Sequence, residues 1–182
     1  MICSDNPNTF DRQFNMRAEN ILNIQLQDLN EVMSLIKEAI AEMDNHHIFQ
    51  WDEVYPDYKT LSSDIQSETM FGIFKNAELA GIVVLDKNQS QEYSDVKWEL
   101  DNDHPLIMHR LCVRPKYQGQ GIAKQLIKFS EQFAIENGLK SLRLDAFSAN
   151  PSAINLYERN GYLKRGIVKF RKGNFYCYEK VL

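Results

Sequence analysis

The stretch that decides the fold spans residues 111–162 and contains two similar segments, LCVRPKYQGQGIAKQLI (111–127) and LRLDAFSANPSAINLYERNGY (142–162). In each segment, a short apolar run typical of a strand leads through a turn into a pattern typical of an amphipathic helix. Asn150 and Pro151 suit the N-cap and first position of the second helix. The sequence therefore predicts two consecutive strand–helix units.

Glycine residues stand where the first of these helices begins. Gly119 and Gly121 have no side chain to keep a ligand from the backbone, and a helix N-terminus presents unpaired N–H groups. The helix dipole favours an anion there, and Lys116 and Lys124 add positive charge nearby. The spacing matches neither a P-loop nor a dinucleotide-binding motif. A pyrophosphate site is predicted, although a glycine turn that merely opens a helix explains this segment equally well.

Together, the two segments resemble the GNAT family of N-acetyltransferases. The family's Q/R-x-x-G-x-G/A signature is matched here by Gln118, Gly121 and Ala123. Its second signature, N-x-x-A-x-x-x-Y-x-x-x-G-F/Y, is matched by Asn150, Ala153, Tyr157, Gly161 and Tyr162. The resemblance is dense over residues 106–165. It implies an α/β (α+β) acyl-CoA N-acyltransferase fold, with a mixed and mostly antiparallel central sheet, splayed parallel strands and helices on both faces.

The resemblance also implies acetyl-CoA as a cosubstrate. The implied cofactor-binding residues are Leu111, Cys112, Val113, Gln118, Gly119, Gln120, Gly121, Ile122, Ala123, Lys124, Asn150 and Tyr157. Tyr157 would lie beside the thioester sulfur, where its phenol can give a proton to the departing thiolate as a general acid. Some members use an acidic base five positions before the asparagine, and this chain has Asp145 there.

Each of these residues also has a purely structural explanation. Asn150 can serve only as a helix cap, and Tyr157 can serve only to pack one helix face. Asp145 lies on the strand face opposite Leu144, where it can be a solvated or arginine-paired residue. Cys112 is expected to be a small buried residue rather than a nucleophile.

An aromatic and acidic segment, residues 44–58, is the expected site of the acceptor. The candidate substrate-binding residues are Trp51, Tyr55 and His109, with Phe49, Asp52, Glu53 and Tyr176 nearby. Aromatic rings and carboxylates suit a cationic amine. Alternatively, Trp51 and Tyr55 close the core and His109 is an internal strand residue. No metal site is expected, because the adjacent His46 and His47 lack a third ligand at a fixed spacing.

Apolar periodicity predicts the remaining elements in the order β-α-α-β-β-β-α-β-α-β-β. The predicted strands are 21–26, 70–75, 79–86, 106–114, 141–147, 162–170 and 175–182, with a further short strand at 96–100. The predicted helices are 28–43, a short helix after Pro56, 120–137 and 151–160. Asp28 and Glu31 have the spacing of a capping box at the first helix.

Composition restricts the class of protein. With 182 residues, 43% of them hydrophobic, and a net charge of −4, the chain fits a single domain over residues 19–182 behind a flexible arm, residues 1–18. Its three scattered cysteines and the lack of a signal-peptide pattern favour the cytoplasm. No apolar run is long enough to span a membrane, and the mild acidity argues against nucleic-acid binding.

The expected function is transfer of the acetyl group of acetyl-CoA to a primary amine of a small molecule or peptide. The alternative is a non-catalytic acyl-CoA-binding regulatory module. Tyr157 discriminates between the two, because a pure binding module needs no proton donor beside the sulfur. An exposed strand edge near the C-terminus could also pair two copies in a homodimer.

Overall fold

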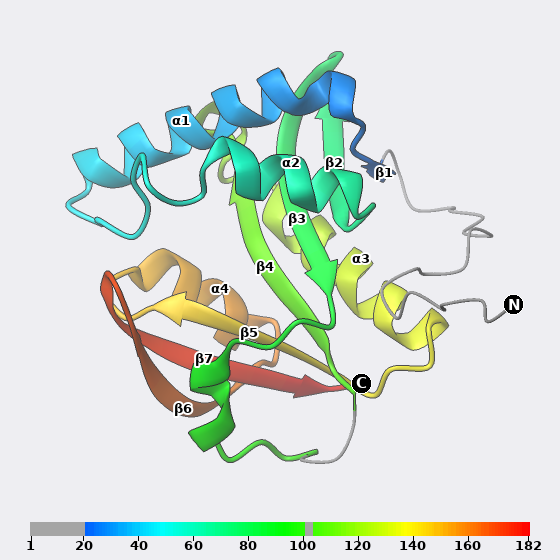
Figure 1. Ribbon diagram of the computed structural model, residues 1–182, viewed down its shortest axis with the longest axis vertical. Helices are drawn as coiled ribbons and strands as arrows, with labels where there is room; N and C mark the ends of the chain where they lie inside the picture. Colours follow the sequence, from blue (N-terminus) through cyan, green and yellow to red (C-terminus); the bar gives the residue numbers. More distant parts are fainter. Residues whose placement is uncertain (1–20, 101–103) are drawn as a thin grey trace, which may run out of the picture.

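A seven-stranded sheet with the order β1-β2-β3-β4-β5-β7-β6 forms the centre of the molecule (Figure 1). The computed structural model describes residues 21–100 and 104–182, so the predicted arm, residues 1–18, lies outside the described residues. The strands are β1 (Ile21–Asn23), β2 (Met70–Lys75), β3 (Glu78–Asp86), β4 (Leu106–Val113), β5 (Ser141–Phe147), β6 (Leu163–Phe170) and β7 (Gly173–Val181). Only β4 and β5 pair in parallel, which confirms the mixed, mostly antiparallel sheet.

Helices cover both faces of this sheet (Figure 1). They are α1 (Leu29–Asn45), α2 (Tyr58–Gln66), α3 (Ile122–Glu136) and α4 (Pro151–Arg159). The apolar stripes of α1 and α2 pack with Ile82 in one core cluster, whereas α3 and α4 pack with Leu142 in another. The short 3-10 helix η2 (Gln91–Asp95) belongs to a third cluster, in which Tyr93 and Trp98 pack with Phe175 of β7.

The parallel strands β4 and β5 separate after a short contact. They pair only at Leu106 with Leu142 and at Ile107 with Arg143, and then diverge toward their C-terminal ends. Opposite β3, strand β4 also carries a bulge, at which Arg110 adopts a left-handed backbone conformation with a φ of 50°. A bulge bends its strand and leaves backbone groups unpaired. The divergence and the bulge together open the sheet at residues 110–113.

The first predicted strand is too long, and the predicted capping box is wrong. Strand β1 ends at Asn23, and a 3-10 turn, η1 (Leu26–Asp28), leads into α1. The carboxylate of Asp28 accepts a hydrogen bond of 3.0 Å from the backbone N–H of Gln25. Glu31 reaches away from its own helix and accepts from the N–H of Leu79. The capping box therefore lies three residues earlier than predicted, between Gln25 and Asp28 at η1, and Glu31 binds β3 instead.

The predicted strand at 96–100 is also wrong. Of its alternating apolar residues, Val96 and Trp98 are buried and Leu100 is half-buried, but the segment joins no sheet. Instead, side chains bind its backbone: Glu179 accepts from the N–H of Glu99 at 2.6 Å, and Arg143 donates to the carbonyl of Leu100 at 2.8 Å. An alternation of apolar and polar residues indicates only that one face of the segment is buried. Here that face packs on the β6–β7 hairpin through side chains, without backbone hydrogen bonds between strands.

Candidate active site

A cavity of about 510 Å³ opens where β4 and β5 diverge, between the start of α3 and the start of α4. The predicted cofactor residues that line it are Leu111, Cys112, Val113, Gln118, Gly119, Gly121, Ile122, Ala123, Lys124, Asn150 and Tyr157. Gln120 is not among the lining residues, because its side chain is bound to the carbonyl of Lys116 and to the amine of Lys75. We call this space the cofactor cavity.

The loop that opens α3 has the conformation that only glycine adopts easily. Gly119 and Gly121 have φ values of 72° and 82°, and no heavy atom lies within 4 Å of a Cβ placed on either residue. The open space beside the backbone therefore lies next to the unpaired N–H groups at the start of α3. This arrangement fits the pyrophosphate of acetyl-CoA, which backbone donors and the helix dipole can hold.

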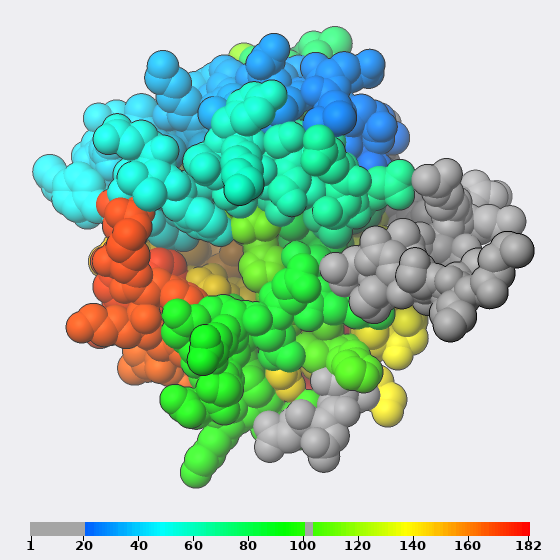
Figure 2. Space-filling model, in the orientation of Figure 1, coloured from blue at the N-terminus to red at the C-terminus, as the bar shows by residue number. Residues whose placement is uncertain are grey.

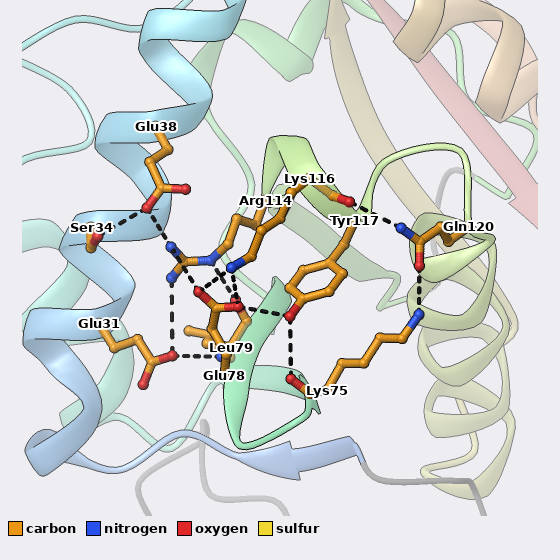
Figure 3. Close-up of polar contacts among 10 residues, drawn as sticks. All are labelled: Glu31, Ser34, Glu38, Lys75, Glu78, Leu79, Arg114, Lys116, Tyr117 and Gln120. Carbon is orange, nitrogen blue, oxygen red and sulfur yellow. Dashed lines mark hydrogen bonds and ion pairs between the residues drawn. The ribbon is translucent and has the colours of Figure 1, made fainter.

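The sequence analysis expected both Lys116 and Lys124 to add positive charge near this loop, but the two lysines differ in their surroundings. The amine of Lys116 donates to the carboxylate of Glu78 at 2.8 Å, and the hydroxyl of Tyr117 donates to the same carboxylate at 2.7 Å (Figure 3). Lys116 is therefore already paired, whereas Lys124 lines the cofactor cavity. Of the two lysines, Lys124 is placed to meet a phosphate.

Arg114 anchors the loop to the rest of the molecule (Figure 3). This buried guanidinium donates to the carbonyl of Leu79 at 2.9 Å and pairs with Glu38 of α1. A buried arginine requires such partners, because an unpaired charge in the interior is costly. The end of β4, the turn after it and α1 are thereby held together beside the cofactor cavity.

Asn150 caps α4 and also lines the cofactor cavity. Its Oδ1 accepts from the N–H of Ala153 at 3.1 Å, so the residue caps α4. Its Nδ2 donates to Oε1 of Gln50 at 3.1 Å, which ties α4 to the segment between α1 and α2. Gln50 lines the cofactor cavity and was missed by the sequence analysis, because a lone amide in an irregular segment carries no pattern.

A second cavity, of about 780 Å³, lies on the other side of the same opening. Figure 2 shows a hollow at this place. It is framed by the α1–α2 segment in cyan, the η2 region in green and the β6–β7 turn in orange. Of the candidate substrate-binding residues, Trp51, Tyr55 and His109 line it, whereas the nearby Phe49, Asp52, Glu53 and Tyr176 do not. We call this space the acceptor cavity.

The two cavities share part of their lining. The residues that border both are Gln50, Trp51, Leu111, Asp145 and Tyr157. The two predicted catalytic residues, Tyr157 and Asp145, therefore lie at the boundary between the cavities. A group bound in one cavity can meet a group bound in the other only at this boundary.

Tyr157 is buried among other tyrosines. Its ring centroid lies 5.9 Å from that of Tyr162 and 6.2 Å from that of Tyr178. Burial, and then the nearby carboxyl of Asp145, raises the pKa of Tyr157 well above its ordinary value. The phenol therefore stays protonated at neutral pH, which is the state a proton donor needs.

Asp145 is half-buried where the two cavities meet, and the partner that the structure shows for it is a tyrosine rather than an arginine. Tyr93 of η2 donates a hydrogen bond of 2.6 Å to its Oδ2. Burial raises the pKa of this carboxyl, and the hydrogen bond from Tyr93 acts in the opposite direction. Tyr93 lies in a polar stretch with no repeating pattern, so the sequence did not reveal it as a partner.

The polar partners of His109 and Arg110 in the acceptor cavity were also missed. His109 lies 3.2 Å from Asp86, and Arg110 holds Asp64 of α2 through a hydrogen bond of 2.8 Å and a second contact of 2.7 Å. Arg110 also donates to the hydroxyl of Tyr55 at 2.7 Å. The sequence did contain one signal for these contacts, because His109 and Arg110 are adjacent polar residues inside an otherwise apolar strand.

The cysteine in the cofactor cavity is not an activated thiol. Burial raises the pKa of Cys112 to about 12, so the thiolate is scarce at neutral pH. This agrees with the prediction of a small buried residue. In the part of the chain that the structure describes, no three His, Cys, Asp or Glu side chains are grouped so as to hold a metal ion.

Comparison with known proteins identifies the family. Residues 34–162 match the model of the acetyltransferase (GNAT) family. The chain is 29% identical over 114 residues to streptothricin acetyltransferase of Escherichia coli, an alignment that covers 63% of this chain and 58% of that protein. The chain belongs to the GNAT family, a class of acetyl-CoA-dependent N-acetyltransferases.

Solved structures agree on the fold. A GNAT acetyltransferase from Streptococcus agalactiae has a TM-score of 0.78 at 21% identity, covering 90% of this chain and 95% of that one. The PaiA N-acetyltransferase of Thermoplasma acidophilum, solved in complex with coenzyme A, has a TM-score of 0.68 at 18% identity, covering 90% and 98%. These likenesses confirm the predicted fold class. Within residues 21–100 and 104–182, no helix is both long and apolar enough to cross a membrane.

Proposed function

We propose that this protein transfers the acetyl group of acetyl-CoA to a primary amine of a small molecule or peptide. The observation that carries this proposal is the position of Tyr157 and Asp145, which border both the cofactor cavity and the acceptor cavity. A proton donor and a carboxyl group at the meeting point of two cavities suit a direct transfer between two bound substrates.

Each part of the boundary has a proposed task. Acetyl-CoA supplies the activated acetyl thioester, and the loop with Gly119 and Gly121 binds its pyrophosphate. Backbone groups of the opened β4 strand, including the N–H of Val113, polarise the acetyl carbonyl. Tyr157 donates its phenol proton to the departing sulfur and recovers a proton from solvent.

Asp145 receives the cationic end of the acceptor in this proposal. An amine enters mostly as an ammonium ion at neutral pH, because an ordinary primary amine has a pKa of ~10.4. The carboxyl group of Asp145, fixed by Tyr93, can accept hydrogen bonds from that ion. Trp51 and Tyr55 then cover the apolar part of the acceptor.

The proposal is tested with purified protein, acetyl-CoA and a panel of amines, with free thiol as the readout. The panel contains n-butylamine, 1,4-diaminobutane, L-lysine, tryptamine and a short peptide with a free N-terminus. Thiol release that depends on one of these amines is expected, together with a rise in melting temperature with acetyl-CoA. A rise in melting temperature without turnover on any amine would support the non-catalytic module instead.

A further inference from the structure

His109 has one bonded and one unbonded ring nitrogen. Its Nε2 lies 3.2 Å from Oδ1 of Asp86, and the ring lines the acceptor cavity. Among the residues that the structure describes, none forms a hydrogen bond with Nδ1. An ionised carboxylate can only accept, so Nε2 of the neutral ring carries the proton and Nδ1 keeps its lone pair. A base oriented in this way by a carboxylate is prepared to take a proton.

Asp86 is well placed to orient that ring. It lies at the end of β3, where its carboxylate also accepts from the backbone N–H of Asn88 at 2.8 Å and from its side-chain amide at 3.3 Å. Burial alone would raise the pKa of Asp86, but hydrogen bonds from His109 and Asn88 outweigh it and lower the pKa. These contacts favour the ionised form of Asp86 and hold its carboxylate in position beside the ring.

Several charged and titratable groups share the acceptor cavity with His109. The charged and titratable groups of the acceptor cavity are Asp86 of β3, Asp64 of α2, Asp145 of β5, Arg110 of β4, Tyr55 of the α1–α2 segment, Tyr93 of η2, and Arg171 and Lys172 of the β6–β7 turn. Arg110 is paired with Asp64, and Arg171 and Lys172 are paired with Asp52. Burial is the largest influence on the pKa of Asp64, Asp86 and Asp145, and a positive charge on His109 lowers the pKa of all three.

Asp145 is less suited to take the proton itself. Its Oδ2 is already occupied by the hydroxyl of Tyr93 at 2.6 Å. A carboxyl group in that position can hold an ammonium ion through its other oxygen, Oδ1, while the proton passes to a neighbouring base. Nδ1 of His109 provides such a base in the same cavity.

From this geometry we infer that His109 is the proton acceptor for the amine and that Asp86 is its positioning residue. The inference rests on the proposed function. The ammonium nitrogen gives one proton to Nδ1 of His109, which becomes an imidazolium while Nε2 keeps its proton toward Asp86. The neutral nitrogen then forms the bond to the acetyl carbon and releases a second proton to solvent. Tyr157 protonates the sulfur as the carbon–sulfur bond breaks, so the net reaction releases one proton.

The kinetic test uses His109→Gln, Asp86→Asn and Asp145→Asn, with the best amine of the panel. His109→Gln should lower kcat/KM about 100-fold and remove the fall in activity on the acidic side that protonation of the ring causes. The ionisation of the amine itself is common to all variants. Asp86→Asn should lower kcat/KM about tenfold and shift the pH at which kcat/KM falls on the acidic side. His47→Gln, at an exposed histidine that lines neither cavity, is the matched control and should behave as the wild type.

A spectroscopic readout does not depend on turnover. Nitrogen-15 NMR of the free protein should show neutral His109 with the proton on Nε2, and Asp86→Asn should disturb that preference. A proton on Nδ1 of the neutral ring would overturn the inference. So would a fall of kcat/KM at acidic pH that persists in His109→Gln but disappears in Asp145→Asn. If no amine is acetylated by the wild type, the proposed function fails, and the role of His109 fails with it even where the tautomer is as expected.

Discussion

The hydroxyl of Tyr93 donates a 2.6 Å hydrogen bond to Oδ2 of Asp145, although the two residues are 52 positions apart in the chain. Arg143, two residues before Asp145 on β5, holds the segment that carries Tyr93. Its guanidinium donates to the side chain of Gln89 at 2.9 Å and to the carbonyl of Leu100 at 2.8 Å. Strand β5 therefore supplies both the carboxyl group and the anchor that brings its partner to it.

The first prediction concerns the pH dependence of stability at Asp145. Its pKa in the folded protein is raised by burial, so the folded state holds this proton more strongly than the unfolded chain does. Stability is therefore lost as the pH rises through the folded pKa, above the ordinary carboxyl value. Asp145→Asn cannot ionise and should remove this loss. Urea unfolding from pH 4 to pH 8 should show that the variant gains stability relative to the wild type as the pH rises. A difference independent of pH would contradict the argument.

The second prediction concerns the general acid. Tyr157→Phe keeps the ring in its cluster and removes the hydroxyl, so kcat should fall by about 100-fold or more while the Kd for acetyl-CoA changes little. Single-turnover rates and calorimetric binding measure the two quantities. Tyr178→Phe is the control, because Tyr178 also lies in this cluster but bonds Glu158 at 3.0 Å outside both cavities. Equal loss of binding and turnover in Tyr157→Phe would rule out the proton-donor role.

The third prediction separates backbone strain from ligand binding. Gly121 and Gly138 both have positive φ values, 82° and 69°, and a Cβ on either meets no heavy atom within 4 Å. Alanine at either position should therefore cost about 1 kcal/mol of unfolding free energy. Gly121 begins α3 in the cofactor cavity, whereas Gly138 follows the other end of this helix.

Only Gly121→Ala should therefore weaken acetyl-CoA binding, by tenfold or more, because its methyl group enters the space beside the backbone donors. Thermal unfolding and calorimetric titration of the two variants make the comparison. Matching affinities in both variants would show that the loop does not hold the pyrophosphate.

The fourth prediction concerns the pair formed by Arg110 and Asp64. Both side chains are largely buried, at 10% and 12% exposure, and the Nε–Oδ2 distance is 2.7 Å. Arg110→Met should cost about 3–5 kcal/mol of unfolding free energy, because it leaves the Asp64 carboxyl buried without its partner. The double variant Arg110→Met with Asp64→Leu should recover most of that loss. Urea unfolding measures both, and additive losses in the double variant would argue against a coupled pair.

The local elements around the cofactor cavity were predictable from the sequence. Glycine at a helix start, asparagine before proline and a regular apolar period each reflect interactions within a few residues. These predicted the strand–helix units, in which the predicted helices 120–137 and 151–160 correspond to α3 (Ile122–Glu136) and α4 (Pro151–Arg159). The paired signatures then indicated the family, and most of the implied cofactor residues line one cavity.

The acceptor side depended on the tertiary structure. Periodicity shows that a residue is buried, but it does not show which distant residue it meets. The strand predicted at 96–100 failed for that reason, because its apolar residues are buried against β6 and β7 through side chains rather than through a ladder. The partners of Asp145, His109 and Arg110 likewise come from segments 23 to 55 residues away in the chain.

Short-range physics therefore determined the conformation of the loop proposed to bind the pyrophosphate, since backbone conformation and helix polarity follow from neighbouring residues. Long-range packing alone determined which groups line the acceptor cavity together, since a hydrogen bond such as that from Tyr93 to Asp145 exists only once two separate segments are packed together.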